Sequence, residues 1–162
     1  KHVSDEVRKL RNTARFMLAN LSGHARSAMA PLNRAGASLL HRYVMHELYC
    51  LETSCRDAYT RFDFASVTRS LIEFATKTLS TLYYDSVKDT LYAGPSEDQP
   101  PILAAMNEIL HTITCVLAPI LPHLAEDLHW YRHGATCDPT PEEVHSMPSF
   151  FQQGWHLSLI HI

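Results

Sequence analysis

The chain has 162 residues, of which 46% are hydrophobic and 19% are charged, and its formal net charge is −3 with the histidines neutral. This length suffices for one domain with a sizeable core, and the composition excludes an intrinsically disordered segment. The slightly acidic balance excludes a chain that binds nucleic acid through overall positive charge, so any RNA contact must come from a local basic patch.

The cysteines and the apolar runs exclude two further classes of protein. No CxxC pair and no secretory signal occur, which predicts reduced, mostly buried thiols in an intracellular protein at Cys50, Cys55, Cys115 and Cys137. The longest apolar stretch, residues 109–121, contains His111, Thr112 and Thr114, and is too short and too polar to span a bilayer. The first residue is lysine, so we expect a segment excised from a longer chain.

The first predicted helix begins at Ser4, a good N-cap, with Asp5 and Glu6 in the first turn, where the helix dipole favours acids. A three-four repeat then predicts one buried stripe formed by Val7, Leu10, Ala14, Met17, Leu18 and Leu21. Gly23 is expected to end the helix, and residues 22–37 to form a connecting loop.

Two long helices follow. The second is predicted from Ser38 to Arg61, with a stripe of Leu40, Tyr43, Val44, Leu48, Leu51, Cys55, Ala58 and Phe62. The third begins after Asp63 as its cap, with a stripe of Val67, Leu71, Phe74, Leu79, Leu82 and Leu91. In this helix the adjacent Tyr83 and Tyr84 should point in two directions, so one is expected in the core and the other free to reach a partner.

A turn-rich loop over residues 94–101 separates these helices from a fourth, expected from Ile102 to Ala118 and ended by Pro119 and Pro122. A shorter helix runs from His123 to about Arg132. Several single-striped helices joined by loops predict an all-α fold, an antiparallel up-and-down helical bundle. We expect the bundle to occupy residues 1–134 and a partly irregular C-terminal extension to occupy residues 135–162.

The first helix carries a basic arc. At about 100° per residue, Arg8, Arg11, Asn12 and Arg15 fall on one arc of roughly 100°, beside the apolar stripe. Guanidinium groups suit bidentate phosphate contacts and stacking on bases, and an asparagine amide can read the edge of a splayed loop base. The arc therefore nominates an RNA contact, although three neighbouring guanidiniums repel one another and need compensation.

Phe16 follows Asn12 by one turn and lies roughly opposite the apolar stripe, where its ring could serve as a stacking platform for an unpaired base. A plainer interpretation stays open for the whole arc. Basic faces on bundle helices are usually solvated, arginine can pair with acids on the next helix, and Phe16 can pack against a second neighbouring helix.

The same stretch carries a family resemblance. RKLRNTARFMLANL, residues 8–21, closely resembles the RKIRNTLRFLLGNL stretch at the start of the anticodon-binding domain of isoleucyl-tRNA synthetases. YTRFDF, residues 59–64, is similar to the helix-to-helix junction of that family. LSTLYYDSVKDTLY, residues 79–92, resembles its LSxFYxDxxKDRLY signature, and APILPHLAED, residues 118–127, resembles its APILPHLAEE turn. Residues 149–155 resemble the segment before a family tryptophan, Trp155 here.

These blocks occur in the family's order and cover nearly the whole chain, and the form of the APILPH block resembles the mitochondrial and bacterial-type branch. The chain departs from the pattern at Val7, Ala19 and Thr90, where the family has tyrosine, glycine and arginine. Residues 156–162 match nothing in the family and are expected to be a non-native tail.

The resemblance implies a helical bundle that docks on the anticodon stem-loop of tRNA(Ile). Its other partner would be the catalytic domain of the same parent chain, and it would bind neither a membrane nor DNA. Arg8, Arg11 and Arg15 would contact phosphates or base edges, Asn12 a base or sugar, and Phe16 a base, with Lys9 as a weaker phosphate candidate. The parent would be an ATP- and magnesium-dependent isoleucine–tRNA ligase in the mitochondrial matrix, or alternatively in a bacterial or other cytoplasm.

No catalytic residue is predicted in this chain. The HIGH and KMSKS motifs of the class I catalytic domain do not occur in these residues, and neither does a glycine-rich phosphate loop. We therefore expect no aminoacylation and no cofactor in this segment, and assign ATP and magnesium to the parent enzyme. A zinc site can be drawn from Glu126, His129, His133 and Cys137, but scattered histidines without a second fixed pair of ligands do not predict a metal.

Two other functions remain open from the sequence. One is the same domain from a valyl- or leucyl-tRNA synthetase, which share the APILPH block; the RNT-RF block favours the isoleucyl family. The other is a helical protein-interaction module whose basic arc binds acidic partners. RNA binding that weakens steeply with salt would separate these two classes of function.

Overall fold

The computed structural model describes residues 2–24, 31–33, 36–134, 142, 146 and 148–153, with side chains described from residue 5 to residue 151 of those ranges. Cys137, Trp155 and the tail after it lie outside the described residues. Within those ranges every regular element is helical, which confirms the all-α prediction: α1 (His2–Leu21), α2 (Leu39–Thr60), α3 (Phe64–Glu73), η2 (Phe74–Tyr84), α4 (Asp85–Ala93), η3 (Ser96–Asp98), α5 (Gln99–Leu117), α6 (Pro122–Arg132) and η4 (Phe150–Gln153).

Capping residues set most of the helix ends. Ser38 accepts a hydrogen bond from the backbone N–H of His41 and begins α2, and Asp63 accepts one from Ser66 and begins α3. Gly23 has a φ of +83°, the left-handed conformation in which glycine ends a helix. The predicted N-cap at Ser4 is wrong, because α1 already begins at His2 and Ser4 lies inside its first turn.

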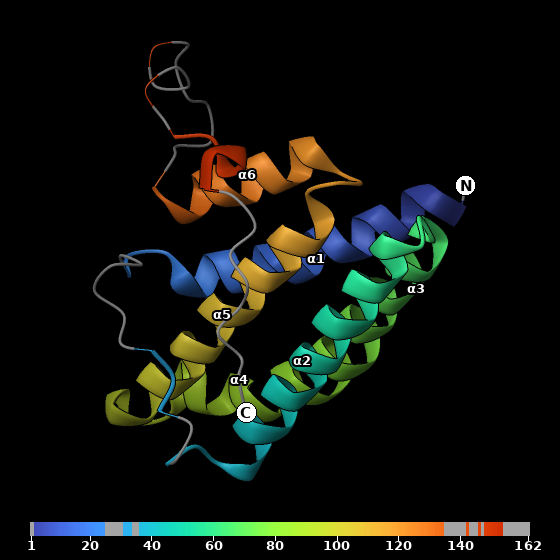
Figure 1. The fold of residues 1–162 in the computed structure, drawn as a ribbon. Coiled ribbons are helices and arrows are strands. Elements are labelled where there is room, and N and C mark those ends of the chain that lie inside the picture. Colours follow the sequence, from blue (N-terminus) through green and yellow to red (C-terminus); the bar gives the residue numbers. More distant parts are fainter. Residues whose placement is uncertain are drawn as a thin grey trace.

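The helices pack around α5. In Figure 1, α2 lies beside the continuous helix formed by α3, η2 and α4, while α1 crosses this pair and contacts η2, α5 and α6. By length and composition alone, the segment Ser96–Leu117 could cross a membrane. However, 61% of its 18-residue apolar stretch is buried inside the bundle. Its apolar character is thus that of a helix surrounded by other helices.

Between Phe74 and Tyr84 the third predicted helix becomes π-helical. Buried positions recur every four residues along α3, η2 and α4, at Val67, Leu71, Ala75, Leu79, Tyr83, Val87 and Leu91. In a plain α-helix, a spacing of four drifts by about 40° at each step and would leave the core within a few turns. The π-helical hydrogen bonds, from residue i to i+5, widen the turns and reverse this drift.

This altered periodicity corrects two predictions. Leu82, expected in the core, is 40% exposed. Tyr83 and Tyr84, of which one was expected to be free, are both buried because η2 packs against two helices. The Tyr84 hydroxyl donates to the Thr13 carbonyl of α1 (3.2 Å), and the Tyr83 ring lies edge-on to His41 of α2. Two predicted members of the α2 stripe, Tyr43 and Phe62, are exposed.

The two tyrosines give a matched test of this packing. Tyr84→Phe removes a buried hydrogen bond and should lower the free energy of unfolding by about 1 kcal/mol. The Tyr83 hydroxyl has no hydrogen-bond partner among the described residues, so Tyr83→Phe should leave stability unchanged or raise it. Urea denaturation of both variants measures the difference, and a larger loss in Tyr83→Phe would contradict the packing described here.

His41 is a buried ionisable group of α2. The residue is 8% exposed, and its Nδ1 lies 2.9 Å from the Ser38 hydroxyl oxygen. Burial lowers the pKa of His41 below its ordinary value, because desolvation penalises the charged imidazolium. The folded state therefore favours neutral His41.

A pH dependence of stability follows from His41. The contribution of neutral His41 to the free energy of unfolding is fully present above about pH 6.5, the pKa in the unfolded chain. It is lost as the pH falls toward the lower pKa of the folded state, because the unfolded chain takes up the proton first. Urea denaturation between pH 7.5 and 5 should show a smaller pH-dependent loss for His41→Gln than for the parent chain. His46→Gln, an exposed histidine on the same helix, is the control. Parallel profiles for the parent and His41→Gln would contradict this assignment.

Candidate nucleic-acid interface

The face of α1 that points to solvent is defined by the residues on its opposite side. Leu10, Ala14, Met17 and Leu21 are at most 5% exposed and pack in the main core. The opposite side of the helix is exposed and carries Arg8, Asn12, Arg15 and Ala19. The predicted basic arc, with Arg11 at one edge, therefore lies on the free surface of the bundle, and Lys9 and Phe16 lie beside its other edge.

Two of the arginines have acidic neighbours. Arg8 pairs with Asp5 one turn earlier (2.7 Å), and the Arg8 side chain is still 72% exposed. Arg11 reaches Asp127 of α6, but at 3.9 Å and with both side chains about half exposed. Exposed pairs of this kind contribute little to stability, typically below about 1 kcal/mol. These carboxylates meet the expected need for compensation among the guanidiniums, and both remain accessible to water.

Arg15 and Asn12 are exposed, and the described residues include no ion pair to Arg15. The arc thus combines one unpaired guanidinium with two that are paired weakly. A phosphate would compete with Asp5 for Arg8 and with Asp127 for Arg11, whereas at Arg15 it would compete only with water.

Phe16 was expected roughly opposite the apolar stripe, as a stacking platform for a base, but its side chain is not fully exposed. It is half-buried, and its ring centroid is 4.3 Å from that of Tyr84 in η2. Its ring therefore packs against a second neighbouring helix, as the plainer interpretation allowed. A contact of Phe16 with RNA stays a prediction and is limited to the part of the ring that is still exposed.

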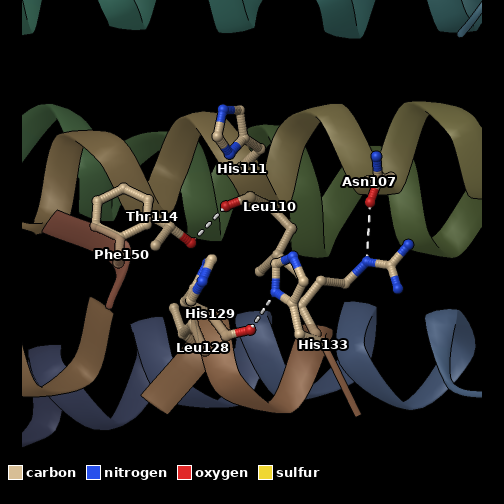
Figure 2. A pocket seen from close by; sticks show the side chains of 9 residues that line it. Asn107, Leu110, His111, Thr114, Leu128, His129, His133 and Phe150 are labelled. Carbon is tan, nitrogen blue, oxygen red and sulfur yellow. Dashed lines mark hydrogen bonds between the residues drawn. The ribbon is translucent and has the colours of Figure 1, made fainter. Parts of the chain in front are cut away.

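A small cavity of about 20 Å³ lies between α5 and α6, and Figure 2 shows three histidines around it. The rings of His129 and His133 are 4.2 Å apart, and His133 Nδ1 donates to the carbonyl oxygen of His129 (2.7 Å). His111 of α5 also lines the cavity, and Phe150 lies against the His129 ring. The space is large enough for about one water molecule and not for an organic ligand.

Glu126, drawn above as a possible zinc ligand, is engaged elsewhere. Its carboxylate accepts hydrogen bonds from the Ser149 hydroxyl and from the Phe150 N–H. These bonds hold Phe150, 6% exposed, against Cys115, Ala118 and Ala125. Within the described ranges no group of three His, Cys, Asp or Glu residues is arranged to hold a metal ion. The contacts around Glu126 instead attach residues 149–151 to the bundle.

A second exposed feature, which sequence reasoning missed, is the turn between α2 and α3. Tyr59, Phe62 and Phe64 form what we call the aromatic corner: the Phe64 ring lies edge-on to both of the others. Phe62 was predicted to extend the buried stripe of α2, but α2 ends at Thr60 and Phe62 is 78% exposed. The cap at Asp63 was the available signal, because a residue just before an N-cap does not continue the preceding helix.

Comparison with known proteins identifies the family. Residues 41–159 match the family described as the anticodon-binding domain of tRNA ligase. The chain belongs to this family of class I tRNA ligase domains. The match begins after α1, so the basic arc lies outside the matched residues.

The named relatives of the chain are isoleucine–tRNA ligases. It is 37% identical over 127 residues to the mitochondrial isoleucine–tRNA ligase of Mus musculus, covering 76% of this chain and 12% of the relative. It is 36% identical over 140 residues to the enzyme of Bacillus cytotoxicus and 35% identical over 142 residues to that of Xylella fastidiosa, covering 84% and 85% of this chain and 15% of each relative. The chain thus spans about one seventh or less of the length of these relatives.

Proposed function

We propose that the chain binds the anticodon stem-loop of tRNA(Ile) through the exposed face of α1. Arg8, Arg11 and Arg15 would contact phosphates or base edges, and Asn12 would hydrogen-bond a base or sugar. Lys9 and the exposed edge of Phe16 would extend the contact at one side. The observation that carries the proposal is that this face concentrates exposed guanidiniums on an otherwise acidic chain, and they take little part in holding the fold together.

The wider role of the chain is proposed on its relatives. In an isoleucine–tRNA ligase, this bundle would hold the anticodon end of the tRNA while a catalytic domain, which would use ATP and magnesium, charges the acceptor end. Both mitochondrial and bacterial relatives support an organellar or bacterial type of enzyme, and we propose the mitochondrial matrix as the location of the parent protein.

Binding should follow the electrostatics of the arc. Affinity for a tRNA(Ile) anticodon hairpin should fall steeply as salt rises, because phosphate neutralisation releases counterions. Arg11→Ala and Arg15→Ala should each weaken binding by about tenfold and reduce the salt slope by about one, whereas Asp127→Asn should tighten binding by removing a competing carboxylate. Fluorescence anisotropy at several salt concentrations measures these effects.

Arg42→Ala, an exposed arginine of α2 away from the arc, is the matched control and should change affinity little. Thermal melts should show all four variants folded, because exposed pairs contribute little to stability. If the arc variants bind the hairpin as the parent does, or if the chain binds an acidic peptide and not the hairpin at low salt, the proposal is wrong.

A further inference from the structure

At the aromatic corner the helix end explains the backbone conformation but not the phenylalanine that adopts it. Phe62 has a φ of +59°, the left-handed region that L side chains rarely adopt and that usually holds glycine after a helix. Its N–H donates to the Tyr59 carbonyl, and the N–H of Asp63 donates to Ala58, so the turn itself needs only backbone groups. Glycine or asparagine would close the same turn with less strain.

The Phe62 ring also gains little from burial. It is 78% exposed, and its contact within the corner is an edge-on approach to Phe64, itself 48% exposed, with ring centroids 6.4 Å apart. Phe64 is in turn supported by Tyr59, whose hydroxyl donates to the Val116 carbonyl of α5. Phe62 is thus a strained and exposed residue whose ring packs on two aromatic residues held in place by the bundle. This arrangement points to contact with a molecule outside the chain.

Charge around the corner favours a polyanion. Residues 61–69 contain two arginines, Arg61 and Arg69, and one acid, Asp63, although the whole chain carries −3. The Asp63 carboxylate is occupied by the backbone N–H and hydroxyl of Ser66 at the start of α3. Arg61 and Arg69 are both exposed, and both lie near enough to help lower the pKa of Asp63, after the two Ser66 hydrogen bonds. Both positive charges are therefore close to the turn that carries Phe62. Exposed guanidiniums beside aromatic rings suit phosphates next to unpaired bases.

The corner and the basic arc lie at the same end of the molecule. Figure 1 places the turn between α2 and α3 beside the start of α1, and α1 contacts α3. A single RNA that followed α1 from Arg15 toward Arg8 would therefore be directed toward the corner.

We propose that the aromatic corner is a second RNA contact, in which Phe62 stacks on an unpaired base while Arg61 and Arg69 hold the adjacent phosphates. The proposal rests on the tRNA-binding function proposed above and extends it to a site outside α1. It predicts that the corner requires unpaired nucleotides, whereas the guanidiniums of the arc also contact paired stems.

The test measures binding of the chain to an anticodon hairpin and to a blunt duplex with the same stem. Phe62→Gly removes the ring and relieves the left-handed strain, so it should melt at the same temperature or higher and yet bind the hairpin about tenfold more weakly. Phe62→Trp should retain binding. Neither variant should alter the weaker binding of the duplex. Tyr92→Ala, which removes a comparably exposed ring from α4, is the control and should match the parent.

Failure of this proposal is distinguishable from failure of the proposed function. If Phe62→Gly binds the hairpin as the parent does while Arg15→Ala is impaired, the arc binds RNA, the corner does not, and a protein partner becomes the alternative for the corner. If both variants bind as the parent does, both proposals are overturned. Equal losses on hairpin and duplex in Phe62→Gly would also overturn the stacking role.

Discussion

The packing of η2 between α1 and α2 determines which side of α1 faces the solvent. The π-helical turns keep one line of side chains in the core from Val67 to Leu91, and they bring Tyr83 and Tyr84 against two different helices. The contacts of Tyr84 with Thr13 and Phe16 fix the rotation of α1 about its own axis. Once Phe16 and the stripe from Leu10 to Leu21 are packed, the arginines have no place except the outer surface.

The electrostatics of α1 explain how a chain of net charge −3 can present a site for a polyanion. Within a screening length of about 10 Å at ordinary salt, the local pattern of charge matters more than the total. Asp5 and Asp127 reduce the positive potential of the arc without cancelling it, because each carboxylate is exposed to solvent and paired with an exposed arginine. Such pairs limit repulsion in the free protein and can yield to a phosphate, which offers more charge and more acceptor atoms.

Local signals in the sequence predicted much of the fold. Ser38, Asp63 and Gly23 act at helix ends as their residue types suggest, and the predicted helices from Ile102 and from His123 agree with α5 and α6 within a few residues. These features depend on short-range hydrogen bonds and on the backbone preferences of single residues, which a sequence displays directly. The resemblance of the motif blocks added the family, which residue patterns alone did not define.

The remaining errors have a common origin in tertiary packing. A helical period of 3.6 residues predicted that Leu82 is buried and that one of the two tyrosines is exposed. In the structure η2 packs against two helices, and its buried residues recur with a period close to four. The spacing of Val67, Leu71, Ala75 and Leu79 contained that signal. A helical wheel shows angles and not neighbours. Phe62 was expected in the core and is exposed because α2 ends before it, and Phe16 is half-buried because Tyr84 covers part of its ring.

The most direct test of the central claim, that α1 presents the RNA-binding surface, is amide NMR mapping of the chain during titration with the tRNA(Ile) anticodon hairpin. We expect the largest chemical-shift changes on the backbone amides of residues 8–19, with the buried amides of α5 little changed. Changes concentrated on the outer face of α2, around Tyr43 and Cys50, with α1 unaffected, would contradict it.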